Sequence, residues 1–298
     1  MWINTPRYIK TELDYLNDDY INFLQISYAL QISVSTDNES VCIGELTGDD
    51  PRLVSHILRY YLTPPHQRSE PYDLNQPHES DYTLFREHFL LNRIFRGKRD
   101  GVFVEIGGFD GEYASNTLIL ERHYGWTGLL AEPDPVNRAF LKQKNRKAWL
   151  LHGCVSGGKK PLKLQMYLRW AGTMGFKNDG ISRSKYFPHL RWYERPGYTS
   201  AWCFPLNTVL RAINMTRIDY FSLDVEGAES SILEGFDFSN IDVKVWQIEH
   251  AIYDPVFPQF STYDSAKRID EYRFLFSRLC ENCSLYSITL HDVVFVKS

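Results

Sequence analysis

The segment Gly101-Val-Phe-Val-Glu-Ile-Gly-Gly-Phe-Asp-Gly111 decides the fold class of this chain. Residues 102–106 are a short apolar run rich in β-branched side chains, which predicts a buried parallel strand. The strand ends in Glu105-x-Gly107-x-x-x-Gly111, and a helix is expected over 114–124. Glycines between a strand and a helix let backbone N–H groups approach a ligand with no Cβ in the way. The pattern predicts a nucleoside-binding turn, and the plainer alternative is an ordinary strand–helix connection.

A carboxylate stands at the end of the next expected strand. Glu132 closes the run 128–132 and follows Gly111 by 21 residues. That is close to the ~20-residue spacing at which an acid meets ribose hydroxyls in nucleotide-binding units. The turn lacks the G-x-G-x-x-G pattern of dinucleotide folds, and Glu105 would repel a pyrophosphate. S-adenosylmethionine has an ammonium and a sulfonium group but no phosphate, so charge favours it over NAD.

The rest of the chain alternates strands with helices. Further strands are expected over 148–155, 219–224 and 243–249, with helices over 135–145, 206–213, 227–235 and 264–280, and a closing hairpin of 285–289 with 293–296. This alternation predicts an α/β fold with a mostly parallel sheet and one antiparallel strand near the C-terminus.

Two other segments are expected beside this core, which is assigned to 98–298. Residues 1–97 predict an N-terminal extension that packs on the core, with a helix starting at Asp50-Pro51, a proline-rich linker over 63–77 and a second helix over 81–96. Residues 157–203 predict an irregular insertion that alternates cations with aromatic rings, as in the run 191–195. Such a segment suits substrate contacts, and a solvated loop is the plainer alternative.

Acidic residues gather where two more strands end. Asp224, Glu226 and Glu229 follow one strand, and Glu249-His250 closes the next. Helix capping explains one such acid but does not need three. Asp224, Glu249 and His250 together match the ligands of an octahedral Mn²⁺ or Mg²⁺ site. They equally match a general base, His250, with a carboxylate that orients its ring. Both alternatives stay open at this stage.

Four runs, in order, resemble the FkbM-type methyltransferase domain: FVEIGGFDGEYASNTLILERHYGWTGLLAEPDP (103–135), KNRKAWLLHGCVS (144–156), CFPLNTVL (203–210) and IDYFSLDVEGAESSILEGFDFSNIDVKVWQIEH (218–250). The resemblance extends over roughly 48–298, with DDPRLVSHILRYYLTPP as its lead-in, and is greatest to the animal subgroup that includes the Star protein of insects. It implies a Rossmann-like seven-strand methyltransferase sheet. It also implies either an O-methyltransferase or, as in Star, a trafficking protein whose catalysis is undemonstrated.

The turn, the strand ends and the resemblance together nominate site residues. Glu132 is expected to bind both ribose hydroxyls, and Cys154 or Val155 to flank the adenine. The full set expected to bind S-adenosylmethionine is Glu105, Gly107, Gly108, Asp110, Gly111, Asn116, Glu132, Pro133, Cys154, Val155 and Asp224. The residues expected to act in catalysis are Asp224, Glu249 and His250.

Composition excludes some classes of function. The net charge of −4 and the pI of about 6.1 argue against a nucleic-acid-binding protein. No apolar run is long enough to span a membrane. The five cysteines, at 42, 154, 203, 280 and 283, have neither a disulfide-framework nor a zinc-ribbon spacing. Asn38, Asn214 and Asn282 lie in N-x-S/T sequons, a weak sign of the secretory pathway.

Two functional hypotheses remain. The first is a methyltransferase acting on a hydroxyl of a hexose or glycan, with a small-molecule hydroxyl as the second acceptor class. The second is a Star-like interaction protein with a vestigial pocket. The chemically competent set Glu105, Gly107, Gly111, Glu132, Asp224 and His250 favours the enzyme. The resemblance implies the lumen of the endoplasmic reticulum or Golgi, with the cytoplasm as the alternative.

Overall fold

The computed structural model describes residues 43–83, 87–169, 174–176, 194–225, 227–251 and 265–298. The chain from residue 42 onward forms one compact unit. Within the described ranges, every helix is too short or too polar to cross a bilayer.

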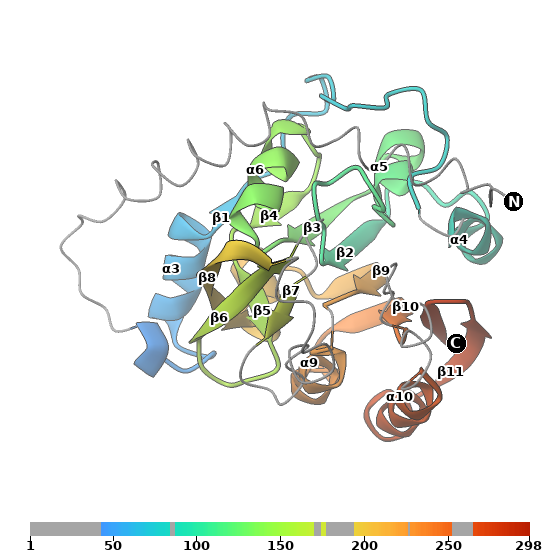
Figure 1. Ribbon diagram of the computed structural model, residues 1–298. Helices are drawn as coiled ribbons and strands as arrows, with labels where there is room; N and C mark the ends of the chain where they lie inside the picture. The colour runs from blue at the N-terminus through green and yellow to red at the C-terminus, as the bar shows by residue number, and fades with distance from the viewer. Residues whose placement is uncertain (1–42, 84–86, 170–173, 177–193, 226, 252–264) are drawn as a thin grey trace, which may run out of the picture. The chain divides into compact units, whose positions relative to one another are not determined.

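Eight strands form the larger of two sheets, in the order β1-β4-β3-β2-β9-β10-β12-β11 (Figure 1). Their bounds are β1 Leu62–Thr63, β2 Val102–Ile106, β3 Thr127–Ala131, β4 Trp149–Leu151, β9 Arg217–Leu223, β10 Asp242–Glu249, β11 Cys283–Ile288 and β12 Asp292–Lys297. β2 pairs in parallel with β3 and β9, whereas β12 runs antiparallel to β10 and β11. The fold class predicted from the sequence is confirmed. Without the two-residue β1, this is the seven-strand sheet that the resemblance implies.

The apolar run that opened the sequence analysis is the centre of this sheet. Phe103 and Val104 of β2 are completely buried, and Trp126 and Tyr220 belong to the same core cluster as Phe103. Gly128 of β3 allows the strands to approach, because a Cβ there would lie 1.9 Å from the carbonyl oxygen of Phe103. A strand that is covered on both faces needs apolar residues at successive positions, which accounts for the unbroken run.

Helices connect the strands. Their bounds are α3 Pro51–Tyr60, α4 Glu87–Phe95, α5 Leu118–Tyr124, α6 Pro135–Gln143, α8 Leu206–Ala212, α9 Glu229–Gly235 and α10 Ser265–Leu279, with a 3-10 turn, η2, at Ile43–Glu45. α3 begins as expected, because the Asp50 carboxylate accepts a hydrogen bond from the Arg52 N–H at 2.9 Å. α3 packs against α8, and α9 packs against α10.

The strand expected over 148–155 is divided between two sheets. β4 stays in the larger sheet, and the chain turns at His152-Gly153 into β5, Cys154–Ser156, which belongs to the smaller sheet. Gly153 permits this turn, since a Cβ there would lie 2.6 Å from the Trp202 carbonyl oxygen. The apolar residues on either side of His152-Gly153 were expected to form one strand, and the division between two sheets was not predicted.

The segment expected to be an irregular insertion contains strands in its described parts. β6 Leu162–Arg169, β7 Met174–Phe176 and β8 Glu194–Pro205 join β5 in a four-stranded sheet of order β5-β8-β6-β7. The expectation of irregular structure is therefore wrong for these residues. Positions 170–173 and 177–193, with most of the predicted substrate contacts, lie outside the described residues.

A disulfide joins two neighbouring strands of the smaller sheet. Cys154 of β5 and Cys203 of β8 are register partners with Cα atoms 4.3 Å apart, and both side chains are buried. A second disulfide joins Cys280, after α10, to Cys283, where β11 begins. Cysteine spacing did not predict either bond. The first depends on a strand pairing across 49 residues, which sequence spacing cannot reveal.

The region before the core contributes an edge strand. Where the segment predicted as a linker begins, β1 pairs antiparallel with β4. The following residues are tied to the core, since the N–H groups of Asn75 and Gln76 donate to the Glu112 carboxylate at 2.7 and 2.6 Å. The expected domain boundary at residue 97 stays a prediction, and 1–42 lie outside the described residues.

Candidate functional site

Three strands of the larger sheet end at the same level, and their ends carry the nominated residues. The N–H groups of Gly107 and Gly108 both donate to the Ala131 carbonyl at the end of β3, at 3.0 and 3.1 Å. The Asp224 N–H donates to the Ile106 carbonyl at 3.0 Å. Gly107 has a φ of +93°, and a Cβ there would lie 1.9 Å from the Asp224 carbonyl oxygen. Glycine is therefore required where β2, β3 and β9 end.

Glu132 is held rigidly beside the glycine turn. Glu132 is only 4% exposed. One carboxylate oxygen accepts a hydrogen bond from the Phe109 N–H at 2.9 Å, and the other accepts one from the Asp134 N–H at 2.8 Å. Burial, followed by repulsion from Asp134, raises the pKa of Glu132 to about 8. A buried acid fixed by two backbone donors, next to the end of β2, is in position to accept hydrogen bonds from ligand hydroxyls.

Glu105 occupies the inside of the turn. It is buried, and it accepts hydrogen bonds from the Asn116 N–H at 2.7 Å, from the Ser115 hydroxyl at 3.0 Å and from the Thr117 hydroxyl. Burial raises the pKa of Glu105, while the charge of Arg146 opposes that shift. These bonds fold residues 115–117 back onto β2, so α5 begins at Leu118 instead of residue 114.

The Glu105 carboxylate was expected to lie beside the ligand, but it is enclosed by its own loop. A different feature now distinguishes the turn from a dinucleotide site. α5 starts seven residues after Gly111, so its N-terminus does not follow the glycines directly as it would under a pyrophosphate. Binding roles for Glu105 and Asn116 stay predictions.

The remaining turn residues shape the loop. Asp110 accepts hydrogen bonds from the N–H groups of Glu112 at 2.9 Å and Tyr113 at 2.7 Å. Gly111 has a φ of +79°, and a Cβ there would lie 2.2 Å from a methyl carbon of Leu141. The Asn116 side chain donates to the Ser222 hydroxyl at 3.0 Å, which links the loop to β9.

The acids after β9 have different environments. Glu229 is buried and accepts hydrogen bonds from the N–H groups of Val225 at 2.9 Å and Gly227 at 3.1 Å. It therefore stabilises the turn before α9, which is the capping role that was the plainer alternative. Asp224 is exposed at the strand end, and Glu226 lies outside the described residues.

His250 faces the hairpin that follows it in the sheet. The backbone N–H of His250 donates to the His291 carbonyl at 2.8 Å, and the ring Nε2 lies 3.2 Å from the Thr289 carbonyl oxygen. A carbonyl only accepts, so this contact places the ring proton on Nε2 and leaves the lone pair on Nδ1. Nδ1 is buried and, within the described part of the chain, has no hydrogen-bond partner. Burial lowers the pKa of His250, so the ring is neutral at neutral pH.

The expected metal site is not found. Within the described ranges, no group of three or more His, Cys, Asp or Glu residues is placed to hold an ion. Glu249 and His250 are neighbours at a strand end, where successive side chains point to opposite faces, and the His250 ring is directed at Thr289. Asp224, Glu249 and His250 therefore do not fit a shared ion, and we derive no step through one.

Comparison with known proteins assigns the chain to a family. A model of the methyltransferase FkbM domain matches residues 105–278, more than half of the chain. The chain belongs to the FkbM methyltransferase family. Methyl transfer is the general activity of such a domain. No curated protein matches the sequence.

Solved structures of methyltransferases are similar to this FkbM chain at low identity. A TehB-like SAM-dependent methyltransferase from Corynebacterium glutamicum is 12% identical, with a TM-score of 0.36, over 72% of this chain and 89% of that one. A methyltransferase from Pyrococcus furiosus is 13% identical, with a TM-score of 0.34, over 71% and 81%. A precorrin-6y C5,15-methyltransferase from Geobacter metallireducens is 10% identical, with a TM-score of 0.33, over 70% and 87%. The chemistry of the site is accordingly argued from this chain's own residues.

The residues expected at the adenine end lie in and beside β5 and after β3. The Cys154 sulfur is bonded to Cys203, so it is not a free thiol. Val155 is buried in β5 beside it, and Pro133 is buried after Glu132. Contacts of these three residues with the cofactor stay predictions.

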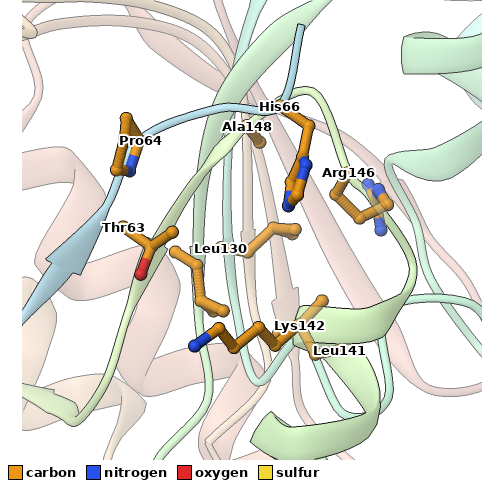
Figure 2. A pocket seen from close by; sticks show the side chains of 9 residues that line it. Thr63, Pro64, His66, Leu130, Leu141, Lys142, Arg146 and Ala148 are labelled. Carbon is orange, nitrogen blue, oxygen red and sulfur yellow. The ribbon is translucent and has the colours of Figure 1, made fainter. Parts of the chain in front are cut away.

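A small hollow near the sheet is not the cofactor site. Figure 2 shows it between the residues that follow β1 and the end of α6, with His66, Lys142 and Arg146 at its rim. Its volume is about 10 Å³, which is roughly what one water molecule needs.

Sequence reasoning missed several residues that support the FkbM site. Arg146 is buried against Glu121, with Nε–Oε2 at 3.1 Å, and its guanidinium donates to the Thr117 hydroxyl at 2.9 Å. Thr289 was also missed, although its carbonyl orients His250. Arg146 lies in the basic run Lys144-Asn-Arg-Lys147, and the sequence does not distinguish it from the two neighbouring lysines.

Proposed function

We propose that this FkbM protein is an S-adenosylmethionine-dependent O-methyltransferase that methylates a hydroxyl of a hexose-containing glycan in the secretory pathway. The observation that carries the proposal is Glu132. It is a buried carboxylate at the end of β3, fixed by the N–H groups of Phe109 and Asp134 and adjacent to the glycine turn.

The donor would bind along the ends of β2, β3 and β9. Glu132 would accept hydrogen bonds from both ribose hydroxyls, since each carboxylate oxygen has further acceptor capacity beyond its one backbone donor. The turn from Gly107 to Gly111 would let the rest of the donor approach the backbone. Asp224, exposed at the end of β9, is the nominated partner of the donor's ammonium group or of an acceptor hydroxyl.

His250 is the proposed general base. A sugar hydroxyl is a weak nucleophile, so its proton must leave as the new C–O bond forms. The contact with the Thr289 carbonyl leaves the lone pair on Nδ1, which is buried, so the acceptor hydroxyl would have to reach that buried atom. Burial keeps the ring neutral at neutral pH. Glu249 lies at the end of the same strand, and its nomination as a second catalytic residue stays a prediction. Alignment of the hydroxyl with the sulfonium methyl would supply much of the remaining acceleration.

The compartment and the acceptor rest on separate arguments. Structural disulfides persist in oxidising compartments, so the buried Cys154–Cys203 bond supports the secretory pathway. The glycan is inferred from the aromatic and arginine-rich run 191–195, of which 191–193 lie outside the described residues. A Star-like origin is compatible with the same compartment.

One experiment tests the activity and the acceptor together. The protein is incubated with S-adenosylmethionine labelled in its methyl group and with panels of glycans, small polyols and proteins, and the label is located by mass spectrometry. The proposal expects label on a hexose hydroxyl. Label on a small polyol would move the acceptor to the second class. Donor binding without any labelled acceptor would favour the non-catalytic, trafficking alternative.

A further inference from the structure

We propose that Asn214 is an N-glycosylation site. The sequence Asn214-Met215-Thr216 is a sequon, and it forms the connection between α8 and β9. This proposal goes beyond methyl transfer and shares with the proposed function only the secretory compartment.

The sequon is presented at the surface in a defined turn. Asn214 and Thr216 are both exposed. Asn214 has a φ of +54°, in the left-handed region that ends helices, and its N–H donates to the Arg211 carbonyl at 3.0 Å. The backbone on either side is thus already bonded to the protein, while the side chain of Asn214 remains accessible. A glycan added before folding completes would not have to be buried.

The surface next to Asn214 has room for a sugar. All three sequon residues line a hollow of about 100 Å³, together with Asn207, Arg211, Asp237, Asn240 and Ile241. That volume is several times the roughly 10–15 Å³ that one water needs. The lining is rich in amide, guanidinium and carboxylate groups, which suit the hydroxyl and acetamido groups of N-acetylglucosamine. Asp237 and Asn240 are held in place by a 2.8 Å hydrogen bond between their side chains.

The position of Asn214 keeps a glycan away from the proposed active site. The Thr216 carbonyl accepts a hydrogen bond from the Asp242 N–H at 2.8 Å, where β10 begins. The sequon therefore lies where β9 and β10 start, whereas Asp224 and His250 follow the points where these strands end. Glycosylation would take place where the strands of the larger sheet begin, and methyl transfer where they end.

A second, independent observation concerns the compartment. The enzymes that glycosylate sequons act in the lumen where disulfides form, and the buried Cys154–Cys203 bond requires such an oxidising environment. In the reaction, Nδ2 of Asn214 attacks C1 of an N-acetylglucosamine linked to a lipid diphosphate. The C1–N bond forms as the C1–O bond breaks, the diphosphate leaves with the electron pair, and the amide loses one proton.

The Asn282 sequon provides a comparison within the same chain. Asn282 is also exposed, but its middle residue, Cys283, is bonded to Cys280, and β11 starts there. Early formation of that bond would restrict access to the sequon. We therefore expect lower occupancy at Asn282 than at Asn214.

The test uses the full chain, exported from eukaryotic cells by a cleavable signal peptide. The secreted protein is treated with peptide:N-glycosidase F in heavy-oxygen water, which converts each glycosylated Asn into a mass-tagged Asp. We expect the tag at Asn214, loss of one glycan's mobility shift in Asn214→Gln and Thr216→Ala, and the full wild-type shift in Thr216→Ser. If Asn214→Gln is not secreted, the two Thr216 variants decide the matter.

An untagged Asn214 in secreted protein that contains the Cys154–Cys203 disulfide would overturn the proposal. Binding of S-adenosylhomocysteine is measured on the same samples, with and without glycan. Failure of glycosylation therefore remains distinct from failure of the donor site.

Discussion

Substitution of Glu132 by Gln separates donor binding from the stability of the loop. Gln keeps the volume of the side chain and one carbonyl oxygen, which can accept from only one of the two backbone donors, Phe109 N–H and Asp134 N–H. Its NH2 group would face the other donor, and at an assay pH above about 8, where Glu132 is ionised, the ribose hydroxyls would lose an anionic acceptor. Each unmet buried hydrogen bond costs about 1–3 kcal/mol.

The assay is isothermal titration with S-adenosylhomocysteine. A loss of about 1–3 kcal/mol corresponds to a dissociation constant raised roughly 5- to 150-fold, at about 1.4 kcal/mol per factor of ten. Glu112→Gln is the control for loop stability, and it is the harsher change because Glu112 also pairs with the buried Lys144 at 2.7 Å. Glu112 is also a buried carboxylate with two backbone donors, Asn75 N–H and Gln76 N–H, but it does not lie at the end of β3. Both variants should lose stability, and only Glu132→Gln should lose donor affinity.

Equal affinity in the wild type and Glu132→Gln would refute the reasoning, provided that both are folded. An equal loss in the two variants would also refute it, because the effect would then come from the loop and not from a ribose contact.

Five other predictions concern Glu132, His250, Gly107 and the Cys154–Cys203 disulfide. The donor affinity of the wild type should rise with pH toward about 8, as Glu132 ionises, while Glu132→Gln should show no such rise. The folded pKa of Glu132 lies above its usual 4.5, so its contribution to stability is complete below pH 4.5 and is lost as the pH rises through about 8. Chemical denaturation of the wild type and of Glu132→Gln across this pH range would detect the loss. His250→Ala should lower kcat far more than donor affinity, and an unchanged kcat would exclude His250 as the base. Because burial lowers the pKa of His250, the acid limb of the wild-type pH–rate profile should have its midpoint below pH 6.5. Gly107→Ala should destabilise the fold by more than the ~1–3 kcal/mol of left-handed backbone strain alone. Gly97→Ala is the control, because Gly97 also has a positive φ but a Cβ there would have no atom within 4 Å, so it should cost only that strain. Equal melting temperatures for the two variants would contradict the close approach of Gly107 to Asp224. Cys203→Ser should lower the melting temperature under oxidising conditions and lose this difference in reductant, and a difference that persists in reductant would show that the disulfide is not its cause.

The central strands could be predicted from the sequence because their signals are local. β2 and β3 are short apolar runs next to glycine and acid, and a polar turn separates the alternating β11 from the apolar run of β12. Glu132 was predicted from its spacing alone, because the length of a strand–helix–strand unit determines where the next strand ends.

The parts that were missed depend on contacts between distant segments. The split at His152-Gly153 and the smaller sheet follow from the pairing of β5 with β8, and no local pattern specifies that pairing. Glu105 was predicted to face the ligand because a strand-end acid usually does. Its enclosure by Ser115, Asn116 and Thr117 depends on how the loop folds back. The orientation of the His250 ring could not be predicted either, because it depends on the Thr289 carbonyl, which lies 39 residues further along the chain.

The most direct test of the central claim is a crystal structure of the protein with S-adenosylhomocysteine. The account predicts that both ribose hydroxyls lie within hydrogen-bonding distance of the Glu132 carboxylate, with the ligand along the turn from Gly107 to Gly111. A ligand bound elsewhere, or a ribose that does not contact Glu132, would contradict it.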